Sequence, residues 1–127
     1  MSTQRRSAAT VAQLLIINVG LYSAEKDKEI SRYKFSSNTL RSLANRQQIR
    51  ESFTNGLFDE LYELGWYLVF LEGEYGIFSI KKLESWIKLS GIRLKSKNIL
   101  KKSDDEINEL FYAQYYTDLL DDDALED

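Results

Sequence analysis

The sequence predicts an α+β fold that is mostly helical. Three stretches carry apolar residues at every third or fourth position, the spacing of amphipathic helices. One stretch differs, because residues 66–71 and 75–81 are β-rich runs joined by Glu72-Gly73-Glu74, a loop typical of a hairpin. With 127 residues, 43% of them hydrophobic, the chain has room for one modest domain with its own core.

The first elements are a helix, a short strand and a short helix. Residues 7–25 combine helical spacing with apolar character, which predicts a largely buried helix. Residues 30–35 alternate apolar and polar side chains, as a half-buried strand does. Ser36 or Ser37 then offers an N-cap hydroxyl for a helix of about two turns that ends near Ala44.

The most regular apolar spacing predicts a long helix over residues 46–64. Asn45 is its expected N-cap, and Gln48 occupies the capping-box position. Gly65 supplies the left-handed position that ends it. Apolar residues recur at intervals of four, four, four and three, and they are Ile49, Phe53, Leu57, Leu61 and Leu64. The first four of them define the face expected to turn to the core.

The last third of the chain is less regular. Residues 83–94 fit either a helical turn or an extended segment, and we leave both open. Ser103 and Glu106 form a capping box that opens an acidic helix. This helix carries four aromatic residues, which either pack over the core or form a partner or dimer interface: Phe111, Tyr112, Tyr115 and Tyr116.

Charge divides the chain into a basic body and an acidic end. All 17 Lys and Arg lie in residues 1–102 beside 10 acids, which gives a net +7, whereas residues 103–127 hold 10 acids and no base. We therefore expect a basic domain over 1–102 and an acidic C-terminal helix and tail over 103–127, packed on that domain or at a dimer seam. Such asymmetry points to nucleic-acid contact or to an interaction tail, although solvated surfaces show it too.

Composition argues against several kinds of chemistry. The chain has no Cys and no His, so it lacks disulfides, thiolate metal sites and the commonest catalytic base. The carboxylates at 118 and 121–123 lack the spacing of a calcium loop. We expect no enzyme activity, no cofactor and no metal. The apolar N-terminal stretch contains Gln13 and Asn18, so we expect a cytoplasmic protein without a signal peptide or membrane span.

The order of the expected elements over residues 7–82 is helix, short strand, short helix, long helix and hairpin. This order resembles the winged helix-turn-helix fold, here with an additional C-terminal helix. The resemblance implies that helix 46–64 is the recognition helix and that the loop 72–76 is the tip of the wing. It implies a double-stranded DNA-binding regulator or accessory protein, of the kind found on bacterial chromosomes or mobile elements.

If the apolar face of helix 46–64 points inward, its first turns present side chains suited to base edges and phosphates. The outward residues are Arg46, Gln47, Arg50, Thr54 and Asn55. Three more bases precede that helix and are expected to add phosphate contacts: Arg32, Lys34 and Arg41.

Acidic residues favour a second interpretation. The second half of the same helix carries Asp59, Glu60 and Glu63, and the expected wing tip carries Glu72 and Glu74, where a wing that grips phosphate prefers Lys or Arg. The alternative is a protein-protein interaction module. It would be an inhibitor or assembly factor that uses the acidic tail against a basic protein partner, as a nucleic-acid mimic does. A homodimer is compatible with either interpretation.

Overall fold

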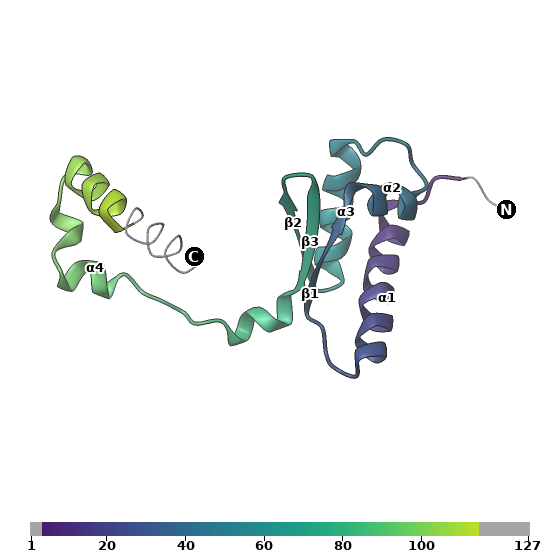
Figure 1. Ribbon diagram of the computed structural model, residues 1–127, viewed down its shortest axis with the longest axis horizontal. Helices are drawn as coiled ribbons and strands as arrows, with labels where there is room; N and C mark the ends of the chain where they lie inside the picture. Colours follow the sequence, from purple (N-terminus) through teal and green to yellow (C-terminus); the bar gives the residue numbers. More distant parts are fainter. Residues whose placement is uncertain (1–3, 115–127) are drawn as a thin grey trace, which may run out of the picture. The chain divides into compact units, whose positions relative to one another are not determined.

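The computed structural model describes residues 4–114, and within them the chain forms two compact units, one ending at Trp86 and one beginning at Ile87. The boundary between the units therefore lies before residue 102, which is where the charge distribution alone had placed a boundary. The first unit contains three α-helices and three β-strands (Figure 1), followed by a short 3-10 helix. The helices and strands are α1 (Ala8–Lys26), β1 (Arg32–Ser36), α2 (Ser37–Ala44), α3 (Glu51–Glu63), β2 (Trp66–Leu71) and β3 (Glu74–Ser79).

The strands form one antiparallel sheet in the order β1-β3-β2. The predicted hairpin is confirmed, because Leu68 pairs with Ile77 and Val69 with Gly76. On the other side of β3, Tyr33 of β1 also pairs with Ile77, so a strand from before α2 completes the sheet. The first unit is therefore α+β, as expected. Strand β3 of the hairpin is the central strand of its sheet.

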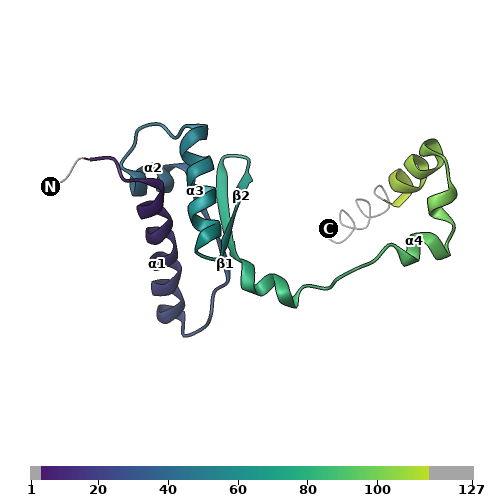
Figure 2. The ribbon, with the colours of Figure 1, turned by 180° about the vertical axis from the view of Figure 1, so that it is seen from behind.

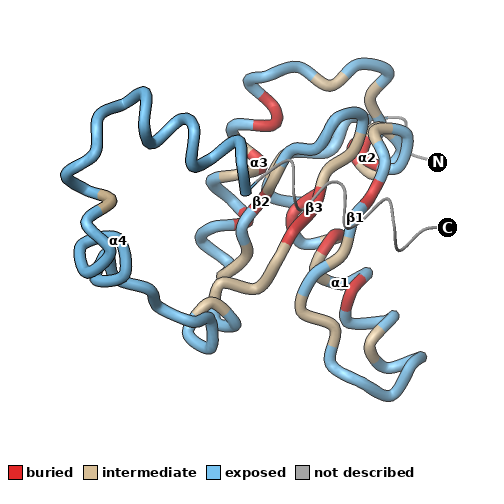
Figure 3. Tube along the Cα trace, turned by 60° about the vertical axis from the view of Figure 1, so that its left-hand side comes forward, coloured by how far each residue is buried: buried red, intermediate tan, exposed pale blue. Residues whose placement is uncertain are grey.

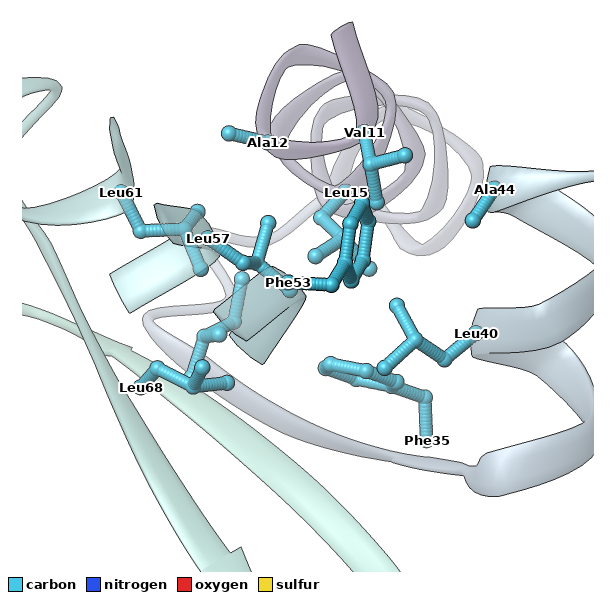
Figure 4. Close-up of a cluster of buried hydrophobic side chains, with 11 residues drawn as sticks. Val11, Ala12, Leu15, Phe35, Leu40, Ala44, Phe53, Leu57, Leu61 and Leu68 are labelled. Carbon is cyan, nitrogen blue, oxygen red and sulfur yellow. The ribbon is translucent and has the colours of Figure 1, made fainter. Parts of the chain in front are cut away.

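The core lies between the sheet and the three helices (Figures 3 and 4). Leu57 and Leu61 of α3 are fully buried and Phe53 nearly so, which confirms the predicted inward face, and Ile49 packs against them half-buried from the preceding loop. Burying each large apolar side chain contributes about 1.5–3 kcal/mol. The other core residues come from every remaining element, and they are Val11, Ala12, Leu15, Phe35, Leu40, Ala44, Leu68 and Ile77.

The first helix is less buried than the sequence predicted. Its N-cap is Ser7, which the spacing alone did not assign, and its core face is Val11, Ala12, Leu15 and Val19. The opposite face is open (Figure 3), with Ile17 55% and Leu21 67% exposed. The prediction failed because apolar character around the whole helix suggested burial on all sides. Among the described residues, α1 also has the length and mean hydropathy of a membrane span, which core helices share.

The long helix begins later than predicted, at Glu51 instead of residue 46. Asn45 does not cap it. Instead Asn45 ends α2 in the left-handed conformation, at φ 53°, and its side chain donates a hydrogen bond backwards to the Gln4 carbonyl. The Gln48 capping box is therefore wrong as well, and residues 46–50 form a loop. The other two helix ends match expectation, with Ser36 capping α2 and Gly65, at φ 90°, following α3.

Residues 80–101 form three short helical segments, which settles the stretch that the sequence left open. They are the 3-10 helix η1 (Ile80–Ser85), α4 (Ile92–Ser96) and the 3-10 helix η2 (Ile99–Lys101). Residues 104–114 are helical, and their capping box is confirmed: Ser103 Oγ accepts from the Glu106 amide, and the Glu106 carboxylate accepts from the Ser103 amide.

That carboxylate is held charged, since the hydrogen bonds from Ser103 lower the pKa of Glu106. Of the four aromatic residues expected at an interface, Phe111 and Tyr112 are exposed, and their rings contact each other at 5.3 Å between centroids. Tyr115 and Tyr116 lie outside the described residues. A role for these aromatics at a partner or dimer interface stays a prediction.

Candidate nucleic-acid interface

An open hollow of about 760 Å³ lies where α2 ends and the loop to α3 begins. Half of its lining residues are arginines, and the other half are uncharged and polar, so no acid of residues 4–114 lines it. We call it the arginine hollow, and its lining residues are Arg5, Arg41, Ser42, Asn45, Arg46, Gln47, Gln48 and Arg50. Of the eight predicted DNA-contacting residues, it collects Arg41, Arg46, Gln47 and Arg50.

The segment before α1 brings Arg5 to this hollow from far away in the sequence. The Arg6 amide donates to the Ala44 carbonyl at 2.9 Å, and the Arg6 guanidinium donates to the Leu43 carbonyl at 2.8 Å. Together with the Asn45 side chain on Gln4, these bonds hold the segment against the end of α2 (Figure 2). They also satisfy carbonyl groups that the last turn of a helix leaves without partners.

Arg46 holds the loop in place more than it faces solvent. Its guanidinium donates to the Arg6 carbonyl at 3.1 Å and lies 4.4 Å from the centroid of the Phe53 ring, a cation–π contact. Its Nε is buried without a hydrogen-bond partner among residues 4–114. Leaving a donor in that state costs about 1–3 kcal/mol, which the ring contact helps to offset. Arg46 is therefore a positioning residue.

The remaining arginines keep their charge available to a ligand. Arg50 is exposed at the N-cap of α3, and Arg41 donates a hydrogen bond to the neutral side chain of Asn38. Within residues 4–114 no arginine of the hollow forms an ion pair. The ion pairs found there join lysines to glutamates elsewhere: Lys34 with Glu74, Lys82 with Glu29, and Lys102 with Glu106.

Four predicted residues lie away from the hollow. Thr54 is a correction, because it is only 7% exposed and its hydroxyl donates to the Glu51 carbonyl at 3.0 Å. The spacing contained this signal, since Thr54 precedes Leu57 by three positions and therefore lies beside the core face. Asn55 is exposed on α3 beyond the hollow. Arg32 and Lys34 are exposed on β1.

Sequence reasoning missed four lining residues. Gln48 and Asn45 had been assigned to the start of a helix, and Ser42 lies in α2 between residues with no chemical signal. Arg5 lies 36 positions before Arg41, and only the hydrogen bonds of the N-terminal segment to α2 bring it near. A pair of adjacent arginines before an uncharged helix was the one hint that the sequence offered.

The hollow has the chemistry of an anion site. A guanidinium stays charged at any physiological pH and binds phosphate or carboxylate through two parallel hydrogen bonds. The first turn of α3 adds backbone amides, because Arg50 provides no side-chain cap for them, and uncapped amides at a helix N-terminus attract anions. Among residues 4–114 no three potential metal ligands lie together, and the carboxylates at 118 and 121–123 fall outside that range.

No family model matches this chain, and no curated protein or solved structure is similar to it. Its function therefore has to be inferred from the fold of the first unit and from the residues that line the hollow. Those residues specify a charge, a shape and a set of hydrogen-bonding groups. Together these define the class of ligand.

Proposed function

We propose that this protein binds double-stranded DNA as a winged helix-turn-helix protein, with α2 and α3 as its two central helices and the β2–β3 hairpin as the wing. The order of the elements supports the proposal, and so does the antiparallel sheet in which β1 joins the hairpin. In helix-turn-helix proteins the N-terminal residues of the second helix contact base edges in the major groove. Here that helix is α3.

The observation that carries the proposal is the arginine hollow at the start of α3. It combines four positive charges, and within the described range 4–114 no acid lines it and no ion pair neutralises them, as a surface that binds phosphate requires. A small anion would need fewer cations than an extended polyanion. Four guanidinium groups around one open hollow therefore favour a nucleic-acid backbone.

Five of the lining residues receive a binding role from their charge or exposure. Arg5, Arg41 and Arg50 bind phosphates, because their charge is unpaired. The amides of Gln47 and Gln48, both exposed in the loop before α3, are suited to adenine edges. Phosphate contacts fix the register of the protein on the duplex, and base contacts supply whatever sequence preference exists.

Salt dependence tests this proposal directly. The wild-type protein is titrated with a random 20-base-pair duplex in fluorescence anisotropy at 50 and 200 mM salt. With three or four arginine contacts, affinity should fall roughly 40- to 150-fold over that range, since each contact adds about −0.9 to the slope of log K against log salt. Arg50→Ala should lower the magnitude of the slope by about 1.

The matched control is Lys28→Ala. It removes one exposed positive charge after α1, at the end of the unit opposite the hollow (Figure 1), and should leave the slope unchanged. Equal slopes for the two variants would contradict the assigned site. Absence of DNA retention by the wild type at 50 mM salt would contradict DNA binding altogether.

That last outcome, together with co-purification of a basic protein, would favour the alternative of a protein-protein module. The acidic segment 103–127, with its net charge of −10, is the part of the chain suited to a basic partner. Helix 104–114 begins with Asp104, Asp105 and Glu106, all of them exposed. Charge reversal in this segment would then abolish partner binding, while changes in the arginine hollow would not.

A further inference from the structure

The outer face of α1 carries no charge. No Asp, Glu, Lys or Arg occurs from Ala8 to Ala24, although the core uses only one side of the helix. The residues opposite the core lie along one side of the helix and all of them are exposed. They are Thr10, Gln13, Ile17, Gly20, Leu21 and Ala24. We call them the α1 stripe.

An uncharged stripe of this length is unusual for a helix face in water, which normally carries charged side chains. The exposed side of α3 follows the usual pattern with Asp59, Glu60 and Glu63. The core does not require the α1 stripe, because it buries Val11, Ala12, Leu15 and Val19. A contiguous apolar surface that the fold itself does not use marks a place for a partner.

The stripe has both a projection and a recess. Leu21 projects with 67% of its surface exposed. A shallow hollow of about 450 Å³ lies nearer the start of the helix and is lined by Gln13, Ile16, Ile17 and Leu64, the last from the end of α3. Above Gly20 the space is open, since a Cβ placed there would meet nothing within 4 Å.

We propose that two copies of this chain associate through their α1 stripes, with the helices antiparallel about a two-fold axis at Ile17. Ile17 is the midpoint of the stripe, so this arrangement places Leu21 of one copy against Gln13 of the other, where it fills the shallow hollow. It also places Leu14 opposite Gly20, a large side chain against a small one. A two-fold interface pairs one surface with itself, and this face carries the complementary shapes that such pairing needs.

The absence of charge on the α1 stripe also suits a second copy of the chain as the partner. Like charges on a face that meets itself would repel, and the stripe has none. In the antiparallel arrangement Arg5 and Arg6 before one helix meet the end of the other, where Glu25, Asp27 and Glu29 alternate with Lys26 and Lys28 and leave a net charge of −1. The helix dipoles then also meet with opposite ends.

A lipid bilayer fits less well, because Val11 and Leu15 of the same helix are fully buried in the core. Spanning a membrane would require the first unit to open. The dimer does not depend on DNA binding, and each can fail without the other.

Sedimentation velocity of the full chain provides the first test. The wild type should sediment at twice the 14.8 kDa of one chain at micromolar concentrations. Gly20→Glu should sediment as a monomer, because it places two like charges in the interface. The same change should not lower the melting temperature of the monomer, since it replaces glycine in a helix with a better helix former in open space.

Cross-linking locates the interface. The chain has no cysteine, so a single introduced one reports only on its own position. Ile17→Cys should form a disulfide-linked dimer under mild oxidation, because the two-fold axis brings the two copies of residue 17 together. Leu71→Cys is the control, at a leucine that is 48% exposed on β2.

Three results would overturn the proposal. They are a monomeric wild type at 100 μM, equal cross-linking at residues 17 and 71, and co-sedimentation of the wild type with phosphatidylcholine vesicles that Gly20→Glu abolishes. The last would assign the stripe to a membrane surface. If the wild type is monomeric, protection of the α1 amides from hydrogen exchange would indicate that another segment of the same chain covers the α1 stripe.

Discussion

The loop after α2 and the turn of the β2–β3 hairpin lie at the same end of the first unit (Figures 1 and 2). That loop lines the arginine hollow, and the two regions differ in charge. The hollow has four arginines and no acid. The turn has Glu72 and Glu74, and its nearest cation, Lys34 on β1, is paired with Glu74 at 3.4 Å between Nζ and Oε1. A polyanion approaching this end meets attraction at one place and repulsion at the other.

This difference shows that the number of cations does not by itself locate an anion site. An anion site is expected where the cations do not already have acidic partners within the protein. Lys34 is as basic as Arg41 and Arg50, but it already has an acidic partner, whereas the cations of the hollow have none within residues 4–114. We therefore propose the hollow, and not the hairpin, as the phosphate-binding site.

The largest effect is expected from removing two cations of the hollow. Arg41→Ala combined with Arg50→Ala should weaken duplex binding roughly 50- to 100-fold at 0.1 M salt, because each phosphate contact contributes about one decade there. Fluorescence anisotropy measures the change. The matched control, Lys28→Ala with Lys81→Ala, removes the same charge at exposed positions away from the hollow. Equal losses in the two double variants would mean that net charge alone governs binding.

The second effect separates positioning from binding inside the hollow. Arg46→Ala should lower the free energy of unfolding by about 1–2 kcal/mol, since it removes the contact with Phe53 and the hydrogen bond to Arg6. Urea denaturation followed by circular dichroism measures it. Arg50→Ala, on an exposed side chain, should stay within about 0.5 kcal/mol of the wild type. A similar loss of unfolding free energy in both variants would contradict the assignment of Arg46 to positioning and of Arg50 to binding.

Much of the fold was predictable because its signals are local. The hairpin follows from two β-rich runs and a Gly-containing turn, and the inward face of α3 follows from the spacing of Phe53, Leu57 and Leu61. The cap at Ser36 and the capping box at Ser103 were predictable for the same reason. In each case a few neighbouring residues decide the structure.

The candidate site was less predictable because it depends on contacts between distant residues. Asn45 can begin one helix or end another, and what holds it here is the Gln4 carbonyl, 41 positions away. That choice moves the start of α3 to Glu51 and turns residues 46–50 into a loop. Arg5 enters the site through the same contact with α2, which no local pattern reveals.

The third effect concerns the acidic turn. Glu72→Gln with Glu74→Gln should strengthen duplex binding about three- to tenfold at 50 mM salt, because it removes repulsion within roughly one Debye length of the bound backbone. The gain should shrink in 200 mM salt, where screening is stronger. A gain that is independent of salt, or no gain at all, would place the turn away from the DNA.

The smallest expected effect tests most directly whether the ion pair of Lys34 explains the difference between the hairpin turn and the hollow. Lys34→Ala should change duplex affinity less than about twofold, since Glu74 already neutralises that cation, and it should change stability by at most about 1 kcal/mol, as expected for an ion pair whose side chains are 64% and 44% exposed. In a Glu74→Gln background the same substitution removes an unpaired cation and should cost severalfold more in affinity. The coupling measured in this double-mutant cycle separates pairing from distance. Equal small effects in both backgrounds would mean that Lys34 lies too far from the DNA to matter, with or without its partner.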